Sequence, residues 1–170
     1  MNYGELFSFI AESITVTKEE KNRAKIEHIL KTTDVDWESV VKLCTHHYVF
    51  PAIYCNYRRS NFLKYLPSDL VDYMKYITDL NRDRNKKIIE QVQELNSLLL
   101  ANNITPIFLK GAGNLIAGIY DDIAERMIGD IDFIFSKEEY PKAIKVLTKS
   151  GYYLLDKGRY HFPYNRHYGR

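Results

Sequence analysis

The stretch Gly129-Asp-Ile-Asp-Phe-Ile-Phe135 sets two carboxylates among apolar residues and then ends in an apolar run. This alternation predicts a β-strand over residues 130–135. Side chains on a strand alternate between its two faces, so Asp130 and Asp132 would share one face, about 6.6 Å apart along the chain. Mg²⁺ prefers such hard oxygen ligands, and a pair of ions about 3.5–4 Å apart would fit. The stretch therefore predicts Asp130 and Asp132 as metal ligands, with a merely solvated strand end as the alternative.

Upstream of this stretch, the sequence predicts a strand, a glycine-bearing turn and a helix in succession. Residues 105–109 form an apolar run typical of a buried strand, with its proline tolerated only near the start. Lys110-Gly-Ala-Gly113 follows as the turn, and the apolar spacing over residues 114–120 predicts the helix. Glycines let a backbone approach a phosphate, and a helix start offers unpaired N–H groups. The turn therefore has features of a triphosphate-binding loop.

Four residues in and near this turn are candidates for binding phosphate. Gly111 and Gly113 would shape the backbone, and Lys110 would add a point charge. Arg126, four residues before Asp130, could reach the same anion with its bidentate guanidinium group. A surface role for Lys110 and a structural salt bridge for Arg126 are the alternatives. The predicted substrate-binding set is Lys110, Gly111, Gly113 and Arg126.

A long helix is the main element expected before Asn103, where the apolar pattern changes from helical to short runs. It would begin at Ser68 and continue to about Asn102, with a bend or break in the polar stretch Asn81-Arg-Asp-Arg-Asn85. Its apolar face must be covered by the rest of the protein. That face consists of Ile88, Val92, Leu95 and Leu99.

Shorter helices are predicted from their capping residues. Thr17-Lys-Glu-Glu20 has the form of a capping box, and Asp36 is placed to cap a helix that begins at Trp37. Ser136 and Glu139 form another capping box, which opens a helix expected to end at Gly151, before a third strand. These elements predict an α+β fold in which residues 1–103 form a helical bundle on a small mixed sheet of residues 104–170.

Composition limits the classes of function. The chain has 170 residues, of which 45% are apolar and 27% charged, as in ordinary globular proteins. Its net charge of +2 is too small to argue for nucleic acid or a membrane surface. The sequence contains no run of about 20 apolar residues and no signal peptide pattern, so we expect a cytoplasmic protein.

A family resemblance rests on the run Ile107-Phe-Leu-Lys-Gly-Ala-Gly113, on Arg126, and on Gly129-Asp-Ile-Asp-Phe-Ile-Phe135 followed by a helix that ends near Gly151. This pattern resembles the uncharacterised nucleotidyltransferase family of the polymerase-β-like superfamily, from about Asp36 to the C-terminus. The resemblance implies a polymerase-β-like core in which Asp130 and Asp132 bind the catalytic metals. It also implies that the glycine turn lies against the triphosphate.

Two departures from the superfamily pattern affect the expected chemistry. The turn is usually Gly-Ser or Gly-Gly with a shorter gap to the first aspartate, whereas Lys110-Gly111 and a longer helix intervene here. The superfamily also places a third carboxylate on a later strand, as the base for the attacking hydroxyl. After Glu139 the only carboxylate is Asp156, so the core of residues 104–170 is expected to be incomplete and the chain truncated.

The function expected is Mg²⁺-dependent transfer of a nucleotidyl group from a nucleoside triphosphate to a hydroxyl acceptor, which could be a small molecule, a protein or RNA. A catalytically weak or inactive nucleotide-binding module of the same fold is the alternative, because the third carboxylate is missing. A lower-ranked hypothesis is an RNA-binding helical module. Its basic residues would be Arg58, Arg59, Arg82, Arg84, Lys86 and Lys87.

Overall fold

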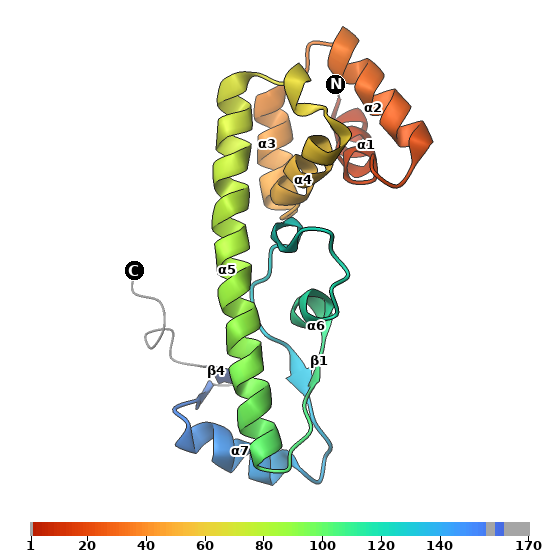
Figure 1. Ribbon diagram of the computed structural model, residues 1–170. Coiled ribbons are helices and arrows are strands. Elements are labelled where there is room, and N and C mark those ends of the chain that lie inside the picture. The colour runs from red at the N-terminus through yellow and green to blue at the C-terminus, as the bar shows by residue number, and fades with distance from the viewer. Residues whose placement is uncertain (1, 156–158, 162–170) are drawn as a thin grey trace.

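The computed structural model describes residues 2–155 and 159–161, and within these the protein is mostly helical (Figure 1). The helices are α1 (Tyr3–Ile14), α2 (Glu20–Thr32), α3 (Trp37–His46), α4 (Phe50–Ser60), α5 (Ser68–Ala101), α6 (Lys110–Ile116) and α7 (Tyr140–Lys149). Two 3-10 turns, η1 (Leu63–Tyr65) and η2 (Ile123–Glu125), separate some of them. The strands are β1 (Ile107–Phe108), β2 (Phe133–Ile134), β3 (Tyr153–Leu155) and β4 (Arg159–His161).

Helix α5 is the element on which the rest of the structure is assembled. It runs without interruption for 34 residues, with the helical bundle α1–α4 at one end and α7 at the other (Figure 1). The break expected in the Asn81–Asn85 stretch is therefore wrong. Asn81 and Asn85 are buried, and their amide groups donate to backbone carbonyls of another segment. Because these polar side chains find partners outside the helix, they do not compete with its backbone hydrogen bonds.

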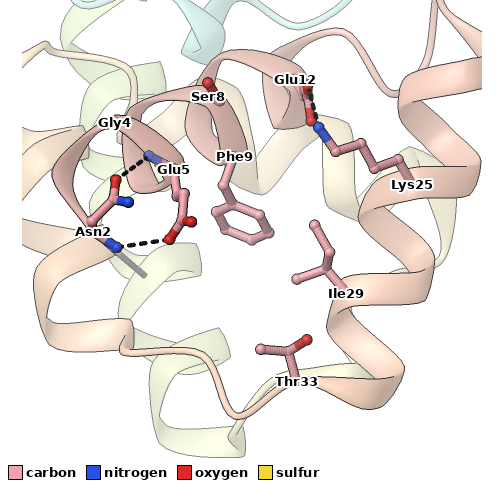
Figure 2. Close-up of a pocket in the computed structure, with 9 residues that line it drawn as sticks. All are labelled: Asn2, Gly4, Glu5, Ser8, Phe9, Glu12, Lys25, Ile29 and Thr33. Carbon is pink, nitrogen blue, oxygen red and sulfur yellow. Dashed lines mark hydrogen bonds and ion pairs between the residues drawn. The ribbon is translucent and has the colours of Figure 1, made fainter.

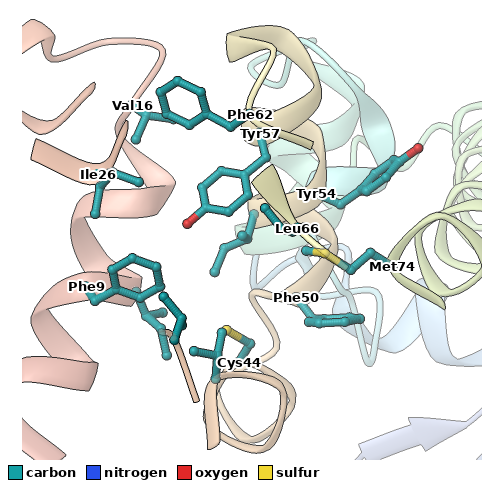
Figure 3. Close-up of a cluster of buried hydrophobic side chains, with 14 of the residues drawn as sticks. Phe9, Val16, Ile26, Cys44, Phe50, Tyr54, Tyr57, Phe62, Leu66 and Met74 are labelled. Atoms are coloured by element: carbon teal, nitrogen blue, oxygen red, sulfur yellow. The ribbon is translucent and has the colours of Figure 1, made fainter. Parts of the chain in front are cut away.

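The first hydrophobic core lies inside the helical bundle and extends to the first half of α5 (Figure 3). Tyr57 and Phe62 are fully buried at its centre with their rings 5.8 Å apart, and Met74 joins them from α5. The Tyr57 hydroxyl shares a 2.7 Å hydrogen bond with Ser13 of α1, so its polar end is satisfied. Ala124 of η2 also belongs to this core. The bundle and the segment that precedes β2 are thus packed together.

A second core lies at the far end of α5 and carries the strands. Leu95 and Leu99 of α5 pack there with Leu147 of α7, and Phe108 of β1 and Phe133 of β2 lie against them. The predicted apolar face of the long helix is confirmed for Leu95 and Leu99. Val92 is also buried, and Ile88 is half-buried.

The strands are shorter than the sequence predicts, and they form two separate antiparallel pairs in the described part of the chain. In the first pair, Phe108 of β1 lies opposite Phe133 of β2. In the second, β3 pairs with β4. The α+β class is confirmed, but these pairs do not form the mixed sheet that was expected. Between β1 and β2 the chain passes through α6 and η2, and β2 then runs antiparallel to β1.

Two of the predicted helix ends are observed, one is displaced and one is not observed. The Asp36 carboxylate accepts from the Ser39 N–H at 3.1 Å, as expected of an N-cap. Ser136 and Glu139 form the reciprocal hydrogen bonds of the predicted capping box, but these close a turn and α7 begins after it, at Tyr140. Gly151 adopts a positive φ of 92° after α7, as expected. Thr17, however, does not cap α2, because its hydroxyl donates to the Asn56 side chain of α4. A tertiary contact has replaced the local one.

Candidate metal and nucleotide site

Asp130 and Asp132 lie on the extended segment that leads into β2, not on a longer strand. Ladder pairing starts only at Phe133, although the Asp132 carbonyl already accepts from the Leu109 N–H at 2.9 Å. Asp130 is exposed, and the Asp132 side chain retains 29% of its accessibility. Both carboxylates are therefore open to solvent beside the end of β1.

Lys110 is the predicted site residue that the structure brings directly to the carboxylates. Its ammonium group lies 3.1 Å from Oδ2 of Asp132. Its backbone adopts a φ of 50°, a conformation that costs a residue with a Cβ roughly 1 kcal/mol or more. The local fold accepts this conformation at the junction between β1 and α6.

The predicted glycine turn is the first turn of α6, which begins at Lys110 and ends at Ile116. The expected helix over residues 114–120 is therefore displaced toward the N-terminus. Helix α6 lies close to β1 at Gly113, and only a residue without a Cβ fits there. A Cβ at this position would lie 2.6 Å from the Phe108 carbonyl oxygen. The atoms nearest to a Cβ at Gly111 would belong to the Ile128 side chain, the closest at 3.0 Å. Gly113 is therefore required by packing, while Gly111 borders the segment that carries the aspartates.

The loop between α6 and β2 is fastened to the helical bundle through Asp122. Its carboxylate accepts from Arg82 of α5 and from Arg58 of α4, with distances of 2.9 and 3.0 Å to Oδ2. It also accepts from the Ala124 N–H at 3.0 Å. Burial alone would raise the pKa of Asp122, but the hydrogen bonds of Arg82 and Ala124 and the nearby charges lower this pKa to about 2.

Acid should weaken the interactions of the Asp122 carboxylate with Arg82, Arg58 and the Ala124 N–H in a defined range of pH. Because the folded-state pKa of Asp122 is about 2 and its ordinary value is 3.8, its contribution to stability is complete above pH 4 and is lost as the pH falls through 2. We expect Asp122→Asn to be about 2 kcal/mol less stable than wild type at pH 7. That difference should shrink between pH 4 and 2 in urea denaturation. A difference that stays constant over this range would contradict the role of Asp122.

Asn81 and Asn85 of α5 also hold the loop between α6 and β2, through hydrogen bonds to the backbone carbonyls of that loop. The Asn81 amide donates to the carbonyls of Ala124 and Arg126, and the Asn85 amide donates to those of Ile123 and Arg126. The sequence interpretation missed this function. A polar pair at a spacing of four residues inside an otherwise amphipathic helix was the available signal, and it was taken for a break.

Residues 33–170 match the model of a protein family described as uncharacterised nucleotidyltransferase, which is more than half of the chain. The chain belongs to this nucleotidyltransferase family. No curated protein and no solved structure matches the chain. The family membership confirms the resemblance inferred from the glycine turn and the two aspartates. It supports nucleotidyl transfer as the general activity and a nucleotide as substrate.

Two pockets of this nucleotidyltransferase lie among its helices, away from the predicted site residues. One pocket of about 470 Å³ lies between α1 and α2, where Glu12 pairs with Lys25 (Figure 2). Its lining residues fall at positions 2–33, so they precede the family region almost entirely. A second groove of about 470 Å³ between α3 and α5 is lined by Trp37, Leu70 and Tyr73, among others. Neither pocket contains the predicted site residues.

The remaining basic side chains of this nucleotidyltransferase have mostly internal partners. Arg58 and Arg82 bind Asp122, Arg59 pairs with Glu125, and Lys86 pairs with Asp83. The basic set considered for RNA binding thus largely stabilises the fold. Arg126 differs from these residues. Its backbone carbonyl is held by α5, while the residue itself is exposed and its guanidinium forms no ion pair with the described residues.

Within residues 2–155 and 159–161, no three acidic, histidine or cysteine side chains gather as a metal cluster. The carboxylates at the predicted site in this part of the chain are those of Asp130 and Asp132. Asp156, the candidate third carboxylate, lies outside the described residues. In the part of the chain that is described, no helix is both apolar enough and long enough to span a bilayer.

Proposed function

We propose that this nucleotidyltransferase binds a magnesium–nucleoside triphosphate at Asp130 and Asp132 and transfers the nucleotidyl group to a hydroxyl acceptor. The observation that carries the proposal is the ammonium group of Lys110, which lies 3.1 Å from Asp132 beside the glycine-bearing start of α6. This arrangement places anionic and cationic groups together on an exposed surface within the family region. A metal ion needs the anionic groups as ligands, and a phosphate needs the cationic group as a partner.

The two carboxylates fit a magnesium ion by their chemistry and their accessibility. Mg²⁺ is usually bound by one or two carboxylates together with substrate phosphates and water, so two aspartates are a sufficient protein contribution. A cation already contacts Asp132 in the form of Lys110, which indicates that this carboxylate accepts positive charge in its present position. When bound, Mg²⁺ would neutralise charge that develops on the transferring phosphoryl group.

The other predicted residues have complementary roles in this proposal. Lys110 would move its charge from Asp132 toward the triphosphate when a metal replaces it. Arg126 is exposed near the same segment and would contact a phosphate oxygen through its guanidinium group. Gly111 and Gly113 would allow the backbone to come close to the nucleotide. The complete core would be of the polymerase-β-like type, with the acceptor a small molecule, a protein or RNA.

Nucleotide titration tests the proposal. Calorimetry with ATP and with CTP should detect binding in the presence of Mg²⁺ and a much weaker signal in EDTA. An assay with a nucleotide labelled at the α-phosphate then follows transfer to protein, RNA or small-molecule acceptors. Absence of Mg²⁺-dependent binding for all four common nucleoside triphosphates would overturn the proposed function.

Lys110→Met should separate metal binding from nucleotide binding. Removing the ammonium group frees Asp132, so free Mn²⁺ should bind about 3–5-fold more tightly, as expected for a partly exposed ion pair worth up to about 1 kcal/mol. Affinity for the magnesium–triphosphate complex should instead fall, because the phosphates lose a positive partner. Mn²⁺ titration by electron paramagnetic resonance and nucleotide calorimetry would measure the two effects. Changes of both affinities in the same direction would contradict the exchange of partners.

A further inference from the structure

Ile128 is the point where three parts of the structure meet just before the metal-binding segment. It is buried, and its side chain packs against the first turn of α6 at Gly111. Its carbonyl oxygen accepts two hydrogen bonds from the Arg84 guanidinium of α5, from Nε at 3.2 Å and from Nη2 at 3.0 Å. Only Gly129 separates Ile128 from Asp130.

The segment that carries the aspartates is thus anchored on both sides. Arg84 holds it at Ile128, and the Leu109 N–H holds it at the Asp132 carbonyl. Between these two points the chain makes no ladder hydrogen bond, because β2 begins only at Phe133. The position of Asp130 therefore depends on the first anchor more than on sheet pairing.

We propose that Arg84 is a positioning residue for the metal-binding carboxylates. This inference rests on the proposed function, and it assigns to a residue of the long helix α5 a part in the nucleotide site. Arg84 forms a fork on one backbone oxygen, which fixes direction as well as distance. Residues that orient metal ligands typically change metal affinity 10–100-fold when they are removed, without contacting the metal.

The exposure of Arg84 makes the test possible without unfolding the protein. The residue is exposed on α5, whereas its neighbours Asn81 and Asn85 are buried and would destabilise the fold if replaced. Arg84→Met removes the fork and keeps helix propensity. Arg84→Lys retains the charge but not the planar fork. Lys86→Met is the matched control, because it removes one exposed positive charge two residues away, where Lys86 pairs with Asp83 of the same helix.

Magnesium–ATP affinity is measured by calorimetry for wild type and the three variants, together with thermal unfolding and amide hydrogen exchange over residues 128–133. We expect about a 10-fold loss of affinity in Arg84→Met, a smaller loss in Arg84→Lys, and no more than about a 2-fold loss in Lys86→Met. Exchange over residues 128–133 should be faster in Arg84→Met, while its unfolding temperature stays near that of wild type.

The outcomes separate this inference from the proposed function. Equal affinity in wild type and Arg84→Met would overturn the positioning role and leave the nucleotide site intact. Equal losses in Arg84→Met and Lys86→Met would also overturn it, because they would reflect net charge alone. If wild type itself binds no magnesium–nucleotide, the proposed function fails and the role of Arg84 fails with it.

Discussion

Gly113→Ala is expected to destabilise the protein by about 3 kcal/mol, the upper end of the usual cost of overpacking. The added Cβ would lie 2.6 Å from the carbonyl oxygen of Phe108 and 3.0 Å from its carbonyl carbon. Both are backbone atoms of β1, so no side-chain rotation can relieve the contact. Helix α6 must move away from the strand, and this movement also displaces Lys110 from Asp132.

Two other glycines provide graded controls in urea denaturation. A Cβ at Gly129 would meet nothing within 4 Å, so Gly129→Ala should change stability by less than about 0.5 kcal/mol. A Cβ at Gly111 would lie 3.0 Å from the nearest atom of the Ile128 side chain, not from a backbone atom, so Gly111→Ala should be intermediate. If Gly113→Ala is as stable as Gly129→Ala, the close approach of α6 to β1 is incorrect.

Asp132→Asn is expected to weaken magnesium–triphosphate binding at least about 100-fold while changing stability by less than about 0.5 kcal/mol. The carboxylate is partly exposed, and it pairs with Lys110, whose side chain is 73% exposed. Such a pair contributes little to folding. The charge of Asp132 therefore serves binding far more than stability.

Asp83→Asn is the matched control for that variant. Asp83 is an exposed aspartate on α5 that pairs with Lys86, so its substitution makes the same change of charge away from the site. It should bind the magnesium–nucleotide like wild type. Similar losses in Asp83→Asn and Asp132→Asn would mean that the protein's overall charge, not a local site, governs binding.

The sequence predicted those parts of the fold that depend on local periodicity. The apolar face of α5 led correctly to the second core, because Leu95 and Leu99 repeat at helical spacing and must be covered. Asp36 marked a helix start because its hydrogen bond is local. The local bonds of Ser136 and Glu139 also form, although α7 begins just after them, at Tyr140. The α+β class followed from these elements.

The errors arose where distant contacts decide the local structure. Asn81 and Asn85 were expected to break α5, but the carbonyls of the η2 loop satisfy them from more than thirty residues away in sequence. Thr17 was expected to cap α2 and instead bonds to Asn56. Strand lengths were overestimated, because an apolar run reports burial and not the presence of a pairing partner.

Part of the candidate site was predictable, and part required the three-dimensional structure. The residues Asp130, Asp132 and Lys110 were identified by residue type and spacing, and the structure places Lys110 against Asp132. Their roles as ligands remain predictions. Arg84 could not be identified, because nothing local to α5 indicates that its guanidinium group reaches the Ile128 carbonyl.

Metal-directed cleavage tests the central claim most directly, because it locates the metal on the chain. Fe²⁺ binds to oxygen ligands of the kind that hold Mg²⁺, and with ascorbate and peroxide it cuts the nearby backbone. In the presence of ATP, we predict cuts around residues 129–133 and 109–111 in wild type, suppressed by excess Mg²⁺ and absent in Asp132→Asn. Cuts confined to other segments, such as the pocket between α1 and α2, or a pattern unchanged in Asp132→Asn, would contradict a metal site at Asp130 and Asp132.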